Sequence, residues 1–114
     1  MSSKLAIYPS LSKKTVFVTG GASGIGAEIV SAFAKQGAKV GFIDLDVDAS
    51  QQLVNTLGDN VHFQICDLCD ISAMKTAMNK LTTLIGAADI LVNNGSVLLY
   101  IKENHTIYTG FYNK

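Results

Sequence analysis

A glycine-rich turn between a strand-like run and a helix-like run constrains this chain more than any other feature. Residues 15–18 read TVFV, a β-branched and aromatic run that is typical of a buried parallel strand. After the turn, Ile25, Ile29 and Phe33 recur every fourth residue, which predicts a helix packed on a sheet. A strand, a glycine turn and a helix in succession indicate an α/β fold.

The alternation of strand and helix patterns continues for most of the chain. Four apolar runs predict strands, at residues 15–19, 40–43, 61–65 and 90–92. Three helices are predicted between them, the first at 24–36, and each is ended by a glycine: Gly37, Gly58 and Gly86. Asp46 or Asp48 is the expected N-cap of the second helix, and Asp70 that of the third.

The predicted helices carry apolar faces. In the second helix the buried residues are expected to be Leu53, Val54 and Leu57. In the third they are expected to be Ile71, Met74, Met78, Leu81 and Ile85.

This order of elements predicts a partial doubly wound (Rossmann) parallel sheet, with strand order 3-2-1-4 and helices on both faces. Residues 61–65 alternate apolar and polar side chains, which fits an edge strand.

We expect a leader at 1–13, a dinucleotide-binding half-domain at 14–96 and a divergent tail without clear periodicity at 97–114. Strands five and six of a complete doubly wound sheet have no residues left to form them.

The charge balance gives no electrostatic reason to propose nucleic acid or a membrane as a partner. Nine lysines, no arginine and nine acidic residues give a net charge of zero, so nothing favours nucleic acid or an anionic membrane. No apolar run approaches the roughly 20 residues that span a bilayer. The first residues lack the apolar segment of a secretory signal, and we expect a cytoplasmic protein.

The glycine turn predicts a phosphate-binding site, because bare backbone N–H groups at a helix N-terminus can approach a pyrophosphate there. The candidate residues are Gly20, Ser23, Gly24, Ile25 and Gly26. A P-loop for nucleoside triphosphates requires lysine and Ser/Thr after its last glycine. Ala27 and Glu28 follow here, which makes a dinucleotide the better candidate.

Asp44 supports the same site independently. It ends the second predicted strand, 18 residues after Gly26, close to the spacing of about 20 that is typical of a ribose-binding acid. Its carboxylate would accept hydrogen bonds from ribose hydroxyls and repel a 2′-phosphate. No basic residue stands beside it or in the glycine turn. The sequence therefore favours NAD over NADP.

Four motifs in order resemble the short-chain dehydrogenase/reductase family over about residues 13–96. They are TGGASGIG at 19–26, Asp44, CDL at 66–68 and LVNN at 91–94. The resemblance implies that Asp67 binds the adenine amino group and that Leu68 covers the ring. It also implies that Asn93, Asn94 and Gly95 lie under the cofactor and brace the fourth strand. Residues 7–11 additionally resemble members that act on sugars, such as pentose 1-dehydrogenases.

The resemblance ends before the catalytic residues of the family. The family motif Asn-Asn-Ala-Gly stands here as NNGS at 93–96, and no tyrosine is followed four residues later by lysine. That spacing matters because a lysine one helical turn away lowers the pKa of the tyrosine phenol for proton transfer. We therefore predict no catalytic residue in this chain and no hydride transfer by it alone.

The cysteines and the histidines of the sequence are better explained as structural residues than as reactive or metal-binding ones. Cys66 and Cys69 form a C-x-x-C pair, but Asp67 and Asp70 disfavour a thiolate there. Two half-buried structural thiols are the favoured interpretation, with a redox pair as the alternative. His62 and His105 lack zinc-ligand spacing, and no metal site is predicted.

Two alternatives to a cofactor-binding module remain open. Without a fifth strand, the fourth strand is an edge that could recruit another copy or a full-length homologue. Residues 97–101 could instead pair with that edge and cover it. The last alternative is a truncated product that does not fold stably.

Overall fold

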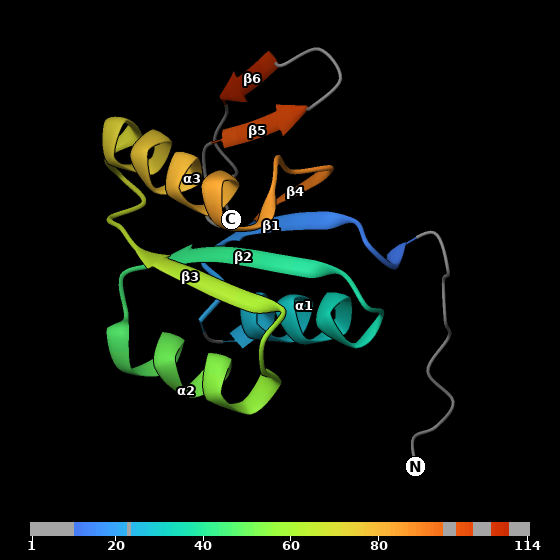
Figure 1. The fold of residues 1–114 in the computed structure, drawn as a ribbon. Helices are drawn as coiled ribbons and strands as arrows, with labels where there is room; N and C mark the ends of the chain where they lie inside the picture. The colour runs from blue at the N-terminus through green and yellow to red at the C-terminus, as the bar shows by residue number, and fades with distance from the viewer. Residues whose placement is uncertain (1–10, 23, 95–97, 102–105, 110–114) are drawn as a thin grey trace.

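The computed structural model describes residues 11–22, 24–94, 98–101 and 106–109. Its main sheet has four parallel strands in the order β3-β2-β1-β4 (Figure 1). Their bounds are β1 Thr15–Thr19, β2 Lys39–Asp44, β3 Val61–Ile65 and β4 Ile90–Asn93. The predicted strand order is confirmed, and β3 lies at one edge as its alternating sequence indicated.

Three helices cover the two faces of this sheet (Figure 1). Helices α1 (Gly24–Lys35) and α2 (Val47–Leu57) lie on one face, while α3 (Ile71–Ile85) lies on the other. α1 packs on β1 and β2, and α2 packs on β3. α3 packs on β2 and β3 as it carries the chain from one edge of the sheet to the other. The prediction of helices on both faces is confirmed.

The sheet separates two hydrophobic clusters, because successive side chains of a strand point to opposite faces. Under α1 and α2 the most buried members are Val16, Val18, Val30, Ala38, Val40, Phe42 and Val61. Phe42 stacks on Phe63 there, with ring centroids 5.7 Å apart. Under α3 the cluster includes Phe17, Ile43, Met74, Leu81 and Leu91.

The predicted helix boundaries follow from capping. The Oδ1 atom of Asp46 accepts a hydrogen bond from the Ala49 N–H at 3.0 Å, so Asp46 and not Asp48 is the N-cap of α2. Asp70 caps α3 in the same way, through the Ala73 N–H at 3.0 Å. Gly58 and Gly86 end these helices with positive φ angles, as predicted.

The predicted apolar faces are wrong at the first turn of two helices. Ile25 is 71% exposed and Ile71 is 43% exposed, although both begin the stripes read from the sequence. Each first turn lies at the carboxyl edge of the sheet, where the strand below has ended. A spacing of four residues also drifts around a helix of 3.6 residues per turn. Val30 and Ala77 are buried residues that these two stripes missed.

The prediction for α2 is also wrong in part. Leu53, Val54 and Leu57 pack on the cluster but are only partly buried, and the buried residue of this helix is Ser50. Its hydroxyl donates to the Asp46 carbonyl oxygen at 2.7 Å, so the polar group is satisfied inside the structure.

The chain after β4 contains a hairpin that the sequence did not predict. β5 (Leu98–Ile101) and β6 (Thr106–Thr109) pair antiparallel and form a sheet of their own. Four-residue strands are too short to show a clear alternation. β5 contacts β4, but in the described part of the chain β4 pairs only with β1. The alternative in which residues 97–101 pair with the β4 edge is therefore not observed for residues 98–101.

Candidate functional site

The predicted site residues converge at the carboxyl edge of the parallel sheet. Parallel strands end at the same edge, so the glycine turn after β1 lies beside Asp44 at the end of β2. Asp67 follows β3 there, and Asn94 follows β4. Of the other predicted residues, Ser23 and Gly95 lie outside the described residues. The topology thus brings together four segments that are far apart in the sequence.

Glycine is required in the turn by close packing of the backbone. A Cβ atom at Gly26 would collide with the carbonyl oxygen of Gly20 and lie 2.8 Å from Nδ2 of Asn94. Gly20 itself has a φ of 69°, and its N–H donates to the Ile43 carbonyl oxygen at 2.7 Å. The turn is therefore pressed against both β2 and the first turn of α1.

Gly21 is a further requirement of this turn that the site prediction left out. A Cβ atom there would lie 2.6 Å from Cβ of Phe42 and 2.9 Å from Cγ2 of Val30. The contact is with buried side chains below the turn, and no short-range pattern in the sequence signals it.

Gly24 differs from the other glycines of the turn. It has a φ of 58°, yet a Cβ atom there would meet no other atom within 4 Å. α1 begins at this residue, and Ile25 next to it is exposed. The first N–H groups of a helix have no partner inside the helix. The start of α1 therefore presents backbone donors to open space, as the binding of a phosphate requires.

Asp44 is oriented by two backbone N–H groups. Its Oδ2 atom accepts from Ala22 at 3.0 Å, and its Oδ1 atom accepts from Asp46 at 2.9 Å. The carboxylate is thus held against the glycine turn. Each oxygen has two lone pairs, so it can accept further hydrogen bonds from the hydroxyls of a bound ligand.

Asn94 connects the end of β4 to the glycine turn. Its Nδ2 donates to the Gly20 carbonyl oxygen at 3.0 Å, and its N–H donates to Oγ1 of Thr19 at 3.0 Å. The Thr19 hydroxyl in turn donates to Oδ1 of Asn93 at 2.9 Å. Thr19 is 2% exposed and was not among the predicted site residues. Its position directly before the first glycine is the only signal that the sequence offers.

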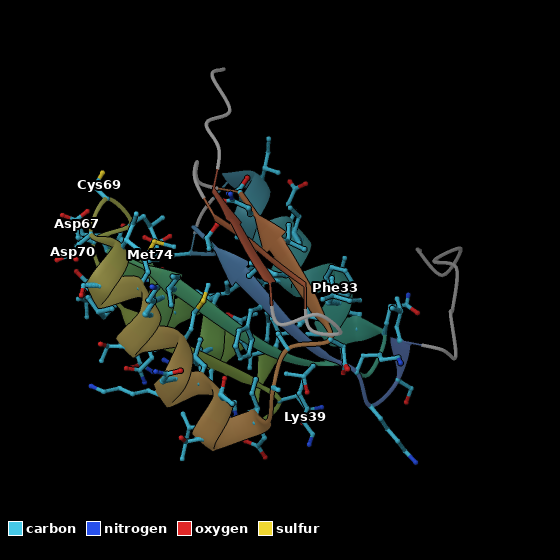
Figure 2. The ribbon with its side chains drawn as sticks, turned by 90° about the horizontal axis from the view of Figure 1, so that it is seen from above. Phe33, Lys39, Asp67, Cys69, Asp70 and Met74 are labelled. Atoms are coloured by element: carbon cyan, nitrogen blue, oxygen red, sulfur yellow. The ribbon has the colours of Figure 1, made fainter. Side chains whose placement is uncertain are left out.

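The loop after β3 provides one wall of the site. Asp67 is exposed and its Oδ1 atom accepts from the Cys69 N–H at 2.9 Å. Leu68 is half-buried, and its Cδ1 atom lies 3.8 Å from where a Cβ atom of Gly20 would be. Leu68 thus lies against Gly20 of the glycine turn. The side chain of Asp67 lies at the periphery of the molecule, close to Cys69 and Asp70 (Figure 2).

The two cysteines of this loop differ from each other, so the expectation of two half-buried thiols is wrong. Cys66 is buried and its thiol donates to the Asp67 carbonyl oxygen at 3.4 Å, whereas Cys69 is exposed. Burial raises the pKa of the Cys66 thiol, and the charges of Asp70 and Asp67 raise it further. A protonated Cys66 fits a structural thiol and argues against a reactive one.

The site has the features that a dinucleotide requires. It combines an open helix start for a pyrophosphate, a fixed acceptor at the end of β2 and an apolar side chain over the turn.

Among the described residues, no group of three His, Cys, Asp or Glu side chains forms a metal site. The described helices also include none that is long and apolar enough to cross a membrane. The cytoplasmic location stays a prediction.

A parallel sheet of order 3-2-1-4, with a glycine turn after its first strand, defines a Rossmann-type dinucleotide-binding fold. Comparison with known proteins specifies the family. Residues 14–109, most of the chain, match the short chain dehydrogenase family. The chain belongs to this family, whose members use a nicotinamide dinucleotide.

The similar proteins include sugar dehydrogenases. The chain is 42% identical over 92 residues to a D-xylose 1-dehydrogenase of Caulobacter vibrioides, covering 78% of this chain and 36% of that protein. It is 39% identical over 93 residues to a probable galactose dehydrogenase of Rhizobium meliloti, with the same coverage. The chain thus spans about a third of the length of these relatives.

A solved structure of similar fold contains the cofactor. It is the 3-ketoacyl-(acyl-carrier-protein) reductase of Brucella melitensis in complex with NADH. The two share a TM-score of 0.72 and 30% sequence identity, over 79% of this chain and 37% of the reductase.

Proposed function

We propose that this chain is the NAD-binding portion of a short-chain dehydrogenase/reductase-type oxidoreductase. The observation that carries the proposal is the position of Asp44, whose carboxylate is fixed beside the glycine turn by the N–H groups of Ala22 and Asp46. The pyrophosphate would lie at the start of α1, and the ribose hydroxyls would donate to Asp44. Asp67 and Leu68 would hold the adenine.

The charge at this position favours NAD over NADP. A 2′-phosphate would lie against the Asp44 carboxylate and be repelled by it. Neither the neighbours of Asp44 nor the described residues of the turn supply a lysine to offset the repulsion.

We propose binding of the cofactor without turnover by this chain alone. No tyrosine of the sequence has a lysine four residues later, so no phenol is prepared for proton transfer. The similarity to sugar dehydrogenases supports a sugar as the substrate of the corresponding complete enzyme.

Calorimetric titration of the purified chain with NAD and with NADP tests this proposal. We expect NAD to bind more tightly, and the Asp44→Asn substitution to weaken NAD by about tenfold or more, since a hydrogen bond to a charged group is lost. Asp48→Asn is the matched control, because Asp48 is an exposed acid in the first turn of α2. Equal affinities for both cofactors, or no heat at millimolar NAD, would contradict the proposal.

A second candidate function is that of a non-catalytic partner of a longer relative. It is favoured by the pairing of β4 with β1 alone within the described residues, which leaves the other side of β4 without a strand of the same sheet. Size-exclusion chromatography with the D-xylose 1-dehydrogenase relative tests it. Separate elution of the two proteins would exclude such a partnership.

The remaining alternative, a truncated product that does not fold stably, makes a different prediction. Slow amide exchange in β1 and β4 would exclude it, whereas exchange at the rate of an unfolded chain would support it.

A further inference from the structure

Ser50 of α2 is completely buried, although its side chain is polar. It is 0% exposed, and its hydroxyl donates to the carbonyl oxygen of Asp46 at 2.7 Å. The Ser50 N–H donates to the same oxygen at 3.1 Å, which is the first hydrogen bond of the helix. Because Ser50 has no accessible surface, it cannot touch a bound ligand. An effect of Ser50 on the cofactor site has to pass through Asp46.

The same type of hydrogen bond occurs elsewhere in the helices. The hydroxyls of Thr56, Thr76, Thr82 and Thr83 each donate to the carbonyl oxygen four residues earlier, and all four threonines are exposed. Ser50 differs from them in two respects. It is buried, and its acceptor belongs to the N-cap residue and not to a residue inside the helix.

Asp46 is held on both sides of its Cα atom. Its N–H donates to Oδ1 of Asp44 at 2.9 Å, and its carbonyl oxygen accepts from Ser50. Its carboxylate is occupied as the cap of α2, through the Ala49 N–H. A rotation of the backbone at Asp46 would carry its N–H away from Asp44. The hydroxyl of Ser50 therefore restrains the donor that Asp44 uses.

The carboxylate of Asp44 depends on that donor for its orientation. The last side-chain torsion of an aspartate has a broad energy minimum, so one hydrogen bond leaves the plane of the carboxylate free to turn. Here Oδ2 accepts from Ala22 and Oδ1 accepts from Asp46, and two donors on different oxygens fix the plane. Asp44 is only half-buried, so solvent can compete for Oδ1 if the Asp46 N–H moves.

We propose that Ser50 is a positioning residue for the selection of the nucleotide. Through Asp46 it fixes the plane of the Asp44 carboxylate, and thereby the discrimination between a ribose hydroxyl and a 2′-phosphate. A carboxylate that is already oriented loses little freedom when it accepts a hydroxyl, and it cannot turn aside from a phosphate. This inference rests on the proposed function, in which the ribose hydroxyls donate to Asp44.

Calorimetric titration of variants with NAD and with NADP tests the proposal. Ser50→Ala removes the hydroxyl and should weaken NAD by about three- to tenfold, the range expected for one hydrogen bond. NADP should be weakened less, so the ratio of the two affinities narrows. Thr56→Val is the matched control, because it removes the same type of bond near the other end of α2. It should leave both affinities unchanged, and an equal narrowing in Thr56→Val would overturn the proposal.

Ser50→Thr separates positioning from packing. It keeps the hydroxyl, which in threonine can also reach the carbonyl four residues earlier, and adds a methyl group at a closed position. We expect a lower melting temperature than for Ser50→Ala, but the same ratio of NAD to NADP affinity as in the unmodified chain. A ratio that narrows with the melting temperature in both variants would show a purely structural role and overturn the proposal.

Combining Ser50→Ala with Asp44→Asn tests the route. If Ser50 acts through Asp44, then Ser50→Ala should have no further effect on NAD in the Asp44→Asn background. Additive losses would overturn the proposal. An Asp44→Asn variant that binds NAD as tightly as the unmodified chain would contradict the proposed function itself. A loss in Asp44→Asn together with an unchanged ratio in Ser50→Ala would overturn only the role of Ser50.

Discussion

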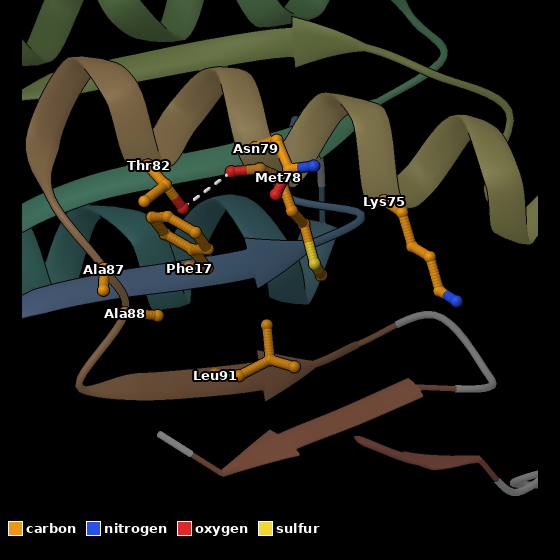
Figure 3. A pocket seen from close by; sticks show the side chains of 8 residues that line it. All are labelled: Phe17, Lys75, Met78, Asn79, Thr82, Ala87, Ala88 and Leu91. Carbon is orange, nitrogen blue, oxygen red and sulfur yellow. Dashed lines mark hydrogen bonds between the residues drawn. The ribbon is translucent and has the colours of Figure 1, made fainter. Parts of the chain in front are cut away.

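The two faces of the sheet are packed differently. Under α1 and α2, the buried residues Val16, Val30, Val40 and Phe42 are all completely inaccessible to solvent. Under α3, Leu91 remains 8% exposed, and a groove of about 360 Å³ separates the helix from β4 (Figure 3). Strands β1 and β4 and the helix α3 line this groove, through Phe17, Leu91, Met78 and Thr82. The same strands contribute to both faces, so the difference comes from the helices that cover them.

The contrast concerns the centre of the sheet, because at β4 neither face is fully closed: Ile90 and Val92 are only partly buried beside the α1 and α2 cluster. Two consecutive βαβ connections place α1 and α2 side by side over β1, β2 and β3. A single connection places α3 mainly over β2 and β3, with a groove between the helix and β4. We therefore expect substitutions to cost more stability in the cluster under α1 and α2 than beside the groove under α3.

The largest expected difference is between two buried phenylalanines. Phe42→Ala leaves a cavity in the closed cluster and should lower the free energy of unfolding by about 5 kcal/mol, the upper end of the usual range. Phe17→Ala should cost about 3 kcal/mol, because Phe17 borders a groove and loses fewer contacts. Urea denaturation measures both. Where Phe42→Ala is too unstable to purify, Phe42→Leu and Phe17→Leu give the same ranking, and a larger loss at Phe17 would refute the comparison.

Enlarging a small residue should have opposite effects on the two faces. Ala38 is completely buried in the closed cluster, and Ala38→Val should cost about 1–3 kcal/mol through overpacking. Ala88 lines the groove, and Ala88→Val should stabilise the protein by about 0.5–2 kcal/mol by filling space. The midpoint of urea denaturation gives both values. Equal destabilisation would mean that the groove does not accept additional side-chain volume.

Removal of the two helix caps should cost the same on both faces. Asp46→Ala and Asp70→Ala each remove one hydrogen bond to a backbone N–H and should each lower stability by about 1 kcal/mol. Asp59→Ala, an exposed acid outside the helices, is the control and should change stability by less than about 0.5 kcal/mol. Thermal denaturation suffices as the measurement. A clearly larger loss at Asp70 would show that α3 depends on its cap more than α2 does.

The smallest expected effect concerns pH. The pKa of the Cys66 thiol is raised in the folded protein by burial, so its contribution to stability is present below the pKa of the unfolded thiol. That contribution is lost as the pH rises through and above about 9, because the unfolded state releases its proton first. Cys66→Ala should flatten the dependence of stability on pH between about 8 and 10, measured by urea denaturation. Cys69→Ala, at the exposed cysteine, should leave it unchanged, and an identical slope in all three proteins would contradict the assignment.

Prediction from sequence succeeded where the signal was local. The strand runs, the capping acids Asp46 and Asp70 and the terminating glycines each depend on a few consecutive residues, and the structure has them in the predicted places. The strand order followed because few topologies satisfy right-handed connections. Prediction failed at Ile25 and Ile71, whose exposure depends on where the sheet edge lies under each helix.

The candidate site was predicted in part for the same reason. Gly20, Gly26 and Asp44 stand in a recognisable spacing, and the structure brings them together. Thr19 and Gly21 were missed because their roles depend on contacts with Asn94 and Phe42, which are remote in the sequence. The roles predicted for Ser23 in the glycine turn and for Gly95 after the fourth strand stay predictions, since both residues lie outside the described residues.

The amino-acid sequence by itself determined the family, the order of the elements and the residue types at the carboxyl edge of the sheet. These properties follow from side-chain periodicity and from backbone requirements that act over a few residues. Only the tertiary structure decided which way the Asp44 carboxylate turns, which cysteine is buried and where a groove remains between α3 and β4. Those outcomes depend on packing between segments that meet only when the chain is folded.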